Sequence, residues 1–317
     1  MRFLPYPEAS AVPNIIVDGA ANARTVLALS HWPKSGTPAA LKADTSTQIV
    51  FRYLDSPASH VSADAVSNNH FDEDGVLGVF ALLQPNRAAR HRALIIDAAQ
   101  AGDFGVYARR EAARVAFVLS AHADASTSPF PQEIFRRGYQ ELTGELYVRL
   151  LDVLPKLVED QAAFRPLWED EDARLSESEA RLDRGDVRIE ERRDLDLAIV
   201  RAATSDAVHP YALHSRTERT RVLLLLGRYA EVQYRYEGWV QMASRRPAPR
   251  VDLSALADEL NQSESSGGRW TFDGVDHITP RLHLEGAKDT TIPGDTLVAR
   301  VEHHLRTGAP AWDPYDR

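Results

Sequence analysis

A histidine and three acidic residues lie within five positions in the segment His70-Phe71-Asp72-Glu73-Asp74, which Gly75 follows. Imidazole nitrogen and carboxylate oxygen atoms bind divalent metal ions and also transfer protons in hydrolytic enzymes. His70, Asp72 and Asp74 occupy alternate positions, so in an extended stretch their side chains point to the same side. Carboxylates that converge in a buried site repel one another unless a cation offsets their charge. The segment therefore predicts a metal site in which these three residues are both ligands and catalytic groups.

The segment is predicted to connect a strand with a helix. AVSNN at residues 65–69 indicates a strand, and the small and apolar residues 75–83 indicate a helix. In α/β folds such a loop leaves the carboxyl edge of a parallel sheet, where ligands commonly bind. The simpler alternative is that Asp74 caps the helix, Asp72 lies near the positive end of its dipole, and His70 is a solvated loop residue.

Other residues are candidates for further metal ligands. Asp103 is expected in a turn after a helix over residues 87–101 that ends at Gly102. His209 and His214 lie in a loop near the expected domain boundary and could supply imidazole ligands, although an exposed proline-containing turn explains them equally well. His31 follows a predicted strand and could reach the same sheet edge as His70, but a packed loop histidine is the commoner case.

Two adjacent arginines, Arg245 and Arg246, are candidates for substrate binding. Guanidinium groups bind phosphate oxygens with two parallel hydrogen bonds, so the pair could form a phosphate-binding surface at a strand edge. Solvated charges that keep an edge strand from aggregating are an equally good explanation.

The pattern of apolar residues predicts an α/β protein with two domains. Two apolar runs in residues 14–30 indicate strands, residues 44–54 a helix, and residues 132–182 two or three helices broken at Pro155 and Pro166. After residue 194, strands rich in valine, leucine and tyrosine are followed by helices near residues 252–262 and 295–307. We therefore expect a parallel-sheet α/β domain with a helical segment over 1–188, and a smaller α+β domain over 189–317.

Composition limits the classes of function. The chain has 317 residues, 44% of them hydrophobic, and no cysteine, so disulfides and thiolate metal sites are excluded and any metal must be held by His, Asp or Glu. The net charge of −9 argues against broad binding of duplex nucleic acid. No stretch approaches the roughly 20 apolar residues of a membrane span, and the first residues lack the pattern of a signal peptide. We expect a cytoplasmic protein that does not bind membranes.

The segment His70 to Gly75, between a strand and a helix, resembles the first motif of the DHH phosphoesterase superfamily. Residues 236–270 are similar in layout to the C-terminal substrate domain of that superfamily, with a strand ending in Ser and Arg, a Val-Asp helix and a Gly-rich loop. The resemblance implies that His70, Asp72 and Asp74 bind metal and that Arg245 or Arg246 and the backbone of Gly267 and Gly268 face the substrate. The Asp-His-His triplet that names the superfamily is absent from the chain.

These observations predict a hydrolase that uses one or two Mn²⁺ or Mg²⁺ ions to cleave a small phosphoester or a short nucleotide. Two alternatives stay open: a non-catalytic protein that binds a nucleotide or a protein partner on the same scaffold, and a metal enzyme of different chemistry, such as an iron-dependent oxidase. The sequence leaves a homodimer open as well.

Overall fold

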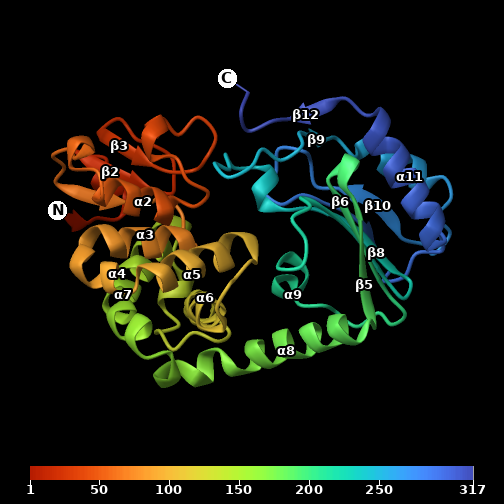
Figure 1. Ribbon diagram of the computed structural model, residues 1–317, viewed down its shortest axis with the longest axis horizontal. Coiled ribbons are helices and arrows are strands. Elements are labelled where there is room, and N and C mark those ends of the chain that lie inside the picture. The colour runs from red at the N-terminus through yellow and green to blue at the C-terminus, as the bar shows by residue number, and fades with distance from the viewer. Residues whose placement is uncertain (317) are drawn as a thin grey trace. The chain divides into compact units, whose positions relative to one another are not determined.

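The chain folds into two compact units in the computed structural model, which describes residues 1–316 (Figure 1). The first unit comprises Met1–Arg174 with Met242–Ser244, and the second comprises the rest of the described chain. The division falls inside helix α8 (Glu169–Arg184), whereas residue 188, where we expected the boundary, lies in strand β5 (Val187–Arg192). The end of α8 belongs to the second unit because Leu182 packs into a hydrophobic cluster of that unit.

The first unit consists of four short strands and a group of helices. Its strands and α-helices are β1 (Arg2–Phe3), α1 (Tyr6–Ala9), β2 (Asn14–Val17), β3 (Thr25–Leu29), α2 (Ser46–Leu54), β4 (Ala65–Ser67), α3 (Glu73–Leu83), α4 (Pro85–Arg90), α5 (Arg92–Phe104), α6 (Arg110–Ala123) and α7 (Tyr139–Glu159). Short 3₁₀ helices cover Ala39–Leu41, Pro57–Ser59, Ile134–Arg136 and Gln161–Leu167.

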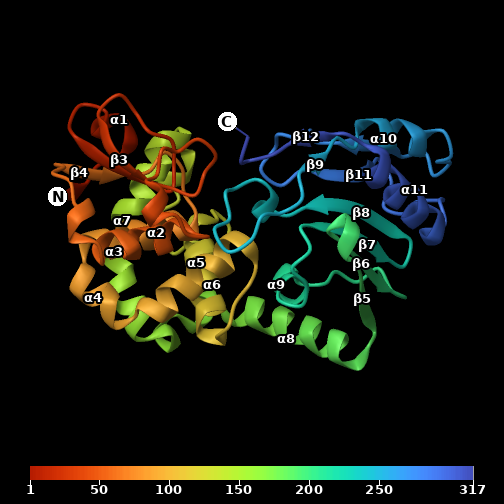
Figure 2. The same ribbon diagram turned by 45° about the horizontal axis from the view of Figure 1, so that its top comes forward.

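The strands of the first unit form a parallel sheet in the order β1-β4-β2-β3. Helices α2 and α3 pack against this sheet and against each other, and α5, α6 and α7 add further helical cover (Figure 2). Gly78 of α3 permits this close packing, because a Cβ atom at that position would lie 2.7 Å from Cγ1 of Val17. The parallel arrangement places the carboxyl ends of β2, β3 and β4 along one edge.

Three local predictions for this unit were wrong. The helix predicted over residues 87–101 is two helices, α4 and α5, and α5 continues past Gly102 to Phe104, where Gly105 with φ 65° ends it. Asp103 therefore lies in the last turn of α5, not in a following turn. Helix α7 also continues through Pro155, because Leu154 and Leu157 on either side are buried in the core.

The second unit is built on a six-stranded mixed sheet in the order β10-β11-β8-β7-β6-β5. Its remaining elements are β6 (Leu197–Ala202), α9 (Pro210–His214), β7 (Arg221–Leu226), β8 (Tyr229–Tyr234), β9 (Arg250–Val251), α10 (Ser254–Asn261), β10 (Arg269–Phe272), β11 (Arg281–Glu285), α11 (Gly294–Thr307) and β12 (Pro310–Trp312), with 3₁₀ helices at Arg193–Leu195 and Tyr236–Gly238. Residues of α10 and α11 pack on one sheet face, and Leu213 of α9 packs on the other.

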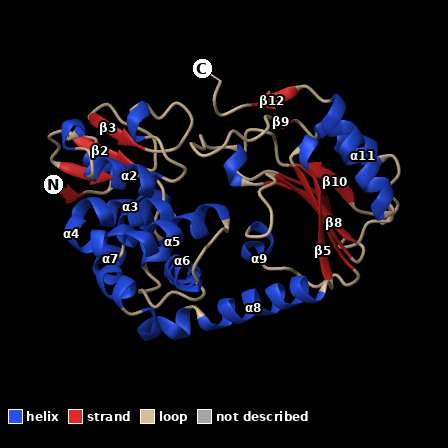
Figure 3. Cartoon of the chain, viewed as in Figure 1, coloured by secondary structure: helices blue, strands red, loops and turns tan. Residues whose placement is uncertain are grey.

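The predicted α/β fold class is confirmed: the first unit has a parallel sheet with helices and the second has a separate mixed sheet (Figure 3). Across residues 1–316, every helix is too short or too polar to cross a bilayer.

Candidate metal centre

Three neighbouring parallel strands carry candidate ligands to the same edge of the first sheet. Asp18 directly follows β2, His31 comes soon after β3, and His70 comes soon after β4. Asp18 has a φ of 52°, in the left-handed region that residues other than glycine seldom occupy and that is often found at functional sites. Its side chain is fully buried. The sheet topology therefore brings together residues that are far apart in the sequence.

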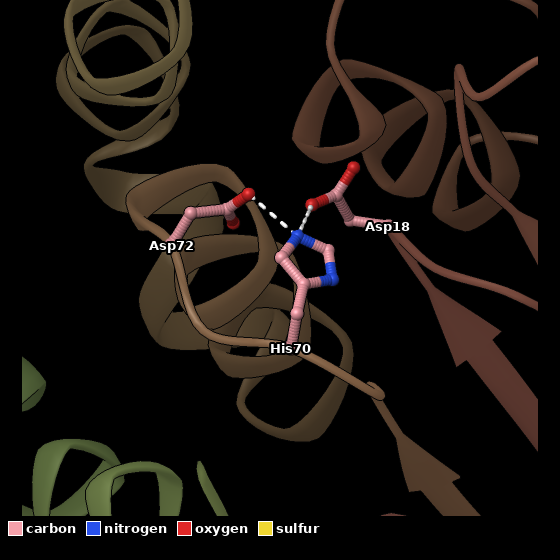
Figure 4. A group of neighbouring side chains, drawn as sticks. All are labelled: Asp18, His70 and Asp72. Atoms are coloured by element: carbon pink, nitrogen blue, oxygen red, sulfur yellow. Dashed lines mark hydrogen bonds and ion pairs between the residues drawn. The ribbon is translucent and has the colours of Figure 1, made fainter. Parts of the chain in front are cut away.

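Two groups of side chains in this region have the spacing of metal ligands. The first is Asp18, His70 and Asp72, and the second is Asp18, His31 and Asp74; within each group one ligand atom from each residue lies within 4.8 Å of the others. In the first group Nε2 of His70 lies 2.7 Å from Oδ2 of Asp72 and 3.3 Å from Oδ2 of Asp18 (Figure 4). In the second, Nε2 of His31 lies 3.3 Å from Oδ1 of Asp18. Asp18 thus turns one oxygen toward each histidine.

Neighbouring groups fix the orientation of these side chains. Nδ1 of His31 lies 2.6 Å from the backbone oxygen of Asp44, so Nδ1 carries a proton, and Nε2, which faces Asp18, is the nitrogen that can take up a second proton or bind a metal ion. The hydroxyl of Ser46 donates to Oδ1 of Asp18 at 2.7 Å. The amide of Gly75 donates to Oδ1 of Asp72 at 2.7 Å. These contacts hold the ligand atoms in place before any ion binds.

The carboxylate of Asp74 has a structural role in addition to its candidate role as a metal ligand. Its two oxygens accept the amides of Ser46 and Thr47, at 2.6 and 2.7 Å, and so satisfy the amino end of α2. The alternative prediction that Asp74 caps its own helix was wrong: Asp72 is the N-cap of α3. Asp74 instead joins the start of α3 to the start of α2.

Asp103 lies beside the second group. Its Oδ2 is 3.6 Å from Nε2 of His31, and its side chain is 2% exposed. The structure therefore places Asp103 with the candidate ligands, as the sequence suggested, although on a helix. Asp97, by contrast, accepts the amides of Ala108 and Arg109 ahead of α6 and has a structural role.

Burial and mutual charge shift the pKa values in this cluster in opposite directions. Burial acts to raise the pKa of Asp18, but hydrogen bonds and attraction from His31 and His70 outweigh it and hold that pKa well below its usual range. Burial acts to lower the pKa of His70, but Asp72 and Asp18 raise it to about 11. The pKa of His31 is likewise raised, because Asp18 outweighs its burial. Without a metal, the two histidines therefore act as the cations that offset Asp18.

The other carboxyl groups are less easily ionised. Burial, followed by repulsion from Asp18, raises the pKa of Asp74 to about 7 and also raises that of Asp72. Burial and repulsion from Asp74 raise the pKa of Asp103 well above its usual value. Among residues 1–316, no lysine or arginine forms an ion pair with any of these carboxylates. The two histidines are therefore the basic side chains that offset this charge, and two positive charges are fewer than the four carboxyl groups present.

The donor set fits hard divalent cations. Oδ2 of Asp18 and Oδ2 of Asp103 are buried, and each faces an imidazole nitrogen at 3.3 and 3.6 Å respectively, longer than an ordinary charge-assisted hydrogen bond. Four carboxylates with two imidazoles suit Mn²⁺ or Mg²⁺, which prefer oxygen ligands, and two such ions would balance four ionised carboxylates. Buried carboxylate oxygens with donors at such long distances are costly unless a cation binds them, so the residues present fit the predicted ions.

The remaining predicted site residues lie in the second unit. Nδ1 of His209 accepts the amide of Tyr211, at the start of α9, and His214 ends that helix. Neither histidine belongs to the two candidate groups found among the described residues. Their predicted role as metal ligands stays a prediction.

Each of the four predicted substrate-binding residues has a structural explanation of its own. Arg245 lies 3.6 Å from the buried carboxylate of Glu237, and Arg246 pairs with Asp313 at 2.5 Å. Gly267 has a φ of 86°, and a Cβ atom on Gly268 would lie 2.8 Å from the backbone oxygen of Glu285. Backbone geometry and packing therefore explain both glycines, and substrate binding by these four residues, Arg245, Arg246, Gly267 and Gly268, stays a prediction.

The residue that sequence reasoning missed is Asp18, which belongs to both groups. Its signal was a buried apolar run, NIIV, that ends in Asp-Gly, the same strand-then-acid pattern that drew attention to residue 72. His31 was recognised as a candidate, but its sequence gave no reason to prefer a ligand over a packed loop residue. Only the sheet order places both beside His70.

Comparisons with known proteins add a family but no activity. Searches of curated proteins and of solved structures find no match. A family profile described as "Family of unknown function (DUF6687)" matches residues 1–316, which is nearly the whole chain. The chain therefore belongs to this family of unknown function.

Proposed function

We propose that the protein is a metal-dependent hydrolase of the phosphoesterase type, acting on a small phosphoester or a short nucleotide. The observation that carries the proposal is the position of Asp18, whose two oxygens face His31 and His70 in two adjacent groups of candidate ligands. A carboxylate shared by two cation sites is the arrangement expected where two ions act on one phosphoryl group.

The proposed ions are Mn²⁺ or Mg²⁺, and this chain would hold them through six side chains. Asp18 would contribute to both sites, His70 and Asp72 to one, and His31, Asp74 and Asp103 to the other. When bound, an ion of this kind supplies Lewis acidity toward a phosphoryl oxygen and makes water a stronger nucleophile. The likeness of residues 70–75 to the first DHH motif supports the choice of phosphoester chemistry. A cytoplasmic location and the substrate contacts of Arg245 and Arg246 remain parts of the proposal.

The roles of the protein groups follow from their contacts. The backbone oxygen of Asp44 fixes the tautomer of His31, so that Nε2 is available as a donor of its lone pair. Asp72 holds both the amino end of α3 and Nε2 of His70, which orients the imidazole toward Asp18. Asp18, His31 and Asp103 are almost fully buried, which strengthens their electrostatic interactions, whereas His70 and Asp72 are 16% and 24% exposed and remain accessible to water.

The test is metal content measured together with turnover. Protein purified in the presence of Mn²⁺ is analysed by inductively coupled plasma mass spectrometry and assayed on bis(p-nitrophenyl) phosphate and a panel of dinucleotides. We expect about two Mn per chain in the wild type, and loss of one of the two ions together with the activity in Asp72→Asn and His70→Ala. Glu141→Gln, which removes an exposed acid of the same unit, serves as the control and should match the wild type. A wild type that stays metal-free in excess Mn²⁺ would refute the proposal.

Asp74 is less suitable for this test than Asp72 or His70, because its carboxylate also has a structural role. Its replacement by alanine would leave the amides of Ser46 and Thr47 without their acceptor, at a cost of roughly 1–3 kcal/mol for each buried group. A loss of activity in that variant would therefore mix metal loss with unfolding.

One observation favours a second candidate, an iron-dependent enzyme. His31 and His70 both face Asp18, and two histidines with one carboxylate form the common ligand set of non-haem Fe²⁺ oxygenases. The same elemental analysis separates the two: iron in protein from unsupplemented cells, retained when Mn²⁺ is offered, would favour this second function. A chain that binds neither ion would favour a non-catalytic binding protein, in line with the absent Asp-His-His triplet.

A further inference from the structure

Two buried polar side chains, Tyr147 and Asn68, are hydrogen-bonded to each other next to the candidate metal centre and belong to neither ligand group. Tyr147, on α7, is fully buried, with its ring stacked on Phe3 at 5.0 Å and edge-on to Phe71 at 5.9 Å. Asn68, between β4 and His70, is 1% exposed. A tyrosine hydroxyl and an amide in such an apolar setting cost free energy unless they are hydrogen-bonded to each other or to the backbone.

The pair forms a short chain of hydrogen bonds that ends at His70. Nδ2 of Asn68 donates to the hydroxyl oxygen of Tyr147 at 2.8 Å. Oδ1 of the same amide accepts the backbone N–H of His70 at 3.1 Å. Because the backbone N–H can only donate, the amide oxygen must face His70 and the amide nitrogen must face Tyr147. The hydroxyl of Tyr147 therefore accepts the amide N–H of Asn68 and holds Asn68 in the orientation that the His70 backbone requires.

The same two side chains also lie in close contact with the backbone next to Asp72 and Asp18. A Cβ atom on Gly75 would lie 2.3 Å from Nδ2 of Asn68, 2.5 Å from the Tyr147 hydroxyl and 3.0 Å from Oδ1 of Asp72. A Cβ atom on Gly19, next to Asp18, would lie 2.7 Å from Oδ1 of Asn68. Asn68 is thus wedged between the turn after Asp18 and the first turn of α3, and glycine is needed on both sides.

The geometry points to Tyr147 and Asn68 as positioning residues of the metal centre, which fix the relative placement of Asp18, His70 and Asp72. This inference rests on the proposed metal-dependent function and deepens it. Groups that orient metal ligands typically contribute 10- to 100-fold to metal affinity, although they touch no ion. The hydroxyl of Tyr147 is the part that matters, because the ring alone would fill the same space.

The first experiment measures the Kd of Mn²⁺ by isothermal titration calorimetry for the wild type, Tyr147→Phe and Asn68→Ala. Both variants should bind Mn²⁺ about 10- to 100-fold more weakly. Tyr53→Phe is the matched control, because it removes a buried hydroxyl of the same unit that accepts the backbone amide of Val61 and has no hydrogen bond to a member of either ligand group. Its Kd should equal that of the wild type. Chemical denaturation of each variant shows whether it is folded, and Asn68→Ala keeps the inference testable if Tyr147→Phe is not.

A double-mutant cycle distinguishes positioning from a general loss of stability. If Tyr147 acts through His70, then Tyr147→Phe in a His70→Ala background should cause less than a 3-fold further change in the Kd of the remaining site. The electron paramagnetic resonance spectrum of bound Mn²⁺ should also change in Tyr147→Phe alone. An unchanged Kd in both single variants, or full additivity with His70→Ala, would overturn the inference and leave the proposed function standing. If the wild type did not bind Mn²⁺, both the inference and the proposed function would be refuted.

Discussion

Replacement of Asp18 by asparagine is the most informative single change in this protein. Asparagine keeps the size of the side chain and can still accept the hydroxyl of Ser46, but it removes the negative charge. Asp18 is the one described residue that belongs to both candidate groups, whereas Asp72 belongs to one. The substitution should therefore affect two ions, and Asp72→Asn only one.

The expected loss of Mn²⁺ affinity follows from the number of ions that each carboxylate would contact. Outer groups that orient a ligand are worth up to about 100-fold in affinity, so loss of a charged ligand should cost at least about 100-fold for each ion it contacts. For Asp72→Asn this is about 2.7 kcal/mol on one site. For Asp18→Asn the effect applies twice, so the product of the two dissociation constants should rise about 10⁴-fold, or about 5.5 kcal/mol.

The assay is titration with Mn²⁺, followed by calorimetry and by the electron paramagnetic resonance signal of the free ion. We expect two bound ions in the wild type, one tight ion in Asp72→Asn, and none in Asp18→Asn over the same range of concentration. If Asp18→Asn retained one site of wild-type affinity, Asp18 would not be shared, and the reasoning from its two oxygens would fail.

Three further predictions concern stability and are checked by chemical or thermal denaturation. Gly78→Ala should lower the free energy of unfolding of the first unit by about 1–2 kcal/mol, because the clash with Val17 exceeds the gain in helix propensity. Arg250→Met should lower that of the second unit by about 3 kcal/mol or more, because this buried guanidinium donates to four backbone carbonyls. Glu264→Gln should lower Tm at neutral pH. Burial acts to raise the pKa of Glu264, but hydrogen bonds from Thr290 and its neighbours outweigh it and lower that pKa, so the stabilisation is present above the unfolded pKa of about 4.3 and is lost as pH falls further.

Exposed positions supply the controls for the first two, and pH supplies the control for the third. Gly138→Ala meets no atom within 4 Å and should change the free energy of unfolding by less than about 1 kcal/mol. Arg193 is 84% exposed, and Arg193→Met should have little effect. For Glu264→Gln, the Tm difference from the wild type should shrink below about pH 4. A difference that stays constant down to pH 3 would contradict the assigned role of the carboxylate.

Local patterns were predicted well wherever a few neighbouring residues decide the structure. The run NIIV forms β2, most of the predicted helix over 44–54 forms α2, and the apolar run after Asp72 forms α3, as expected from hydrophobic periodicity. The errors at Gly102 and Pro155 have a tertiary cause. Gly102 lies inside α5 because Glu73 packs so closely against it that a larger residue would not fit. Helix α7 continues past Pro155 because the leucines on either side of the proline are buried in the core.

The sequence by itself determined that His70, Asp72 and Asp74 leave a strand end together, because they lie within five residues and their spacing is fixed by the backbone. The sequence offered His31 and Asp103 as candidates and missed Asp18, and only the tertiary structure decided that all three join them. Their positions depend on the strand order β4-β2-β3 and on the packing of α5, which no local pattern encodes. The same holds for Tyr147, 79 residues from Asn68 along the chain: their hydrogen bond exists because α7 packs against α3, a contact set by the burial of whole helix faces.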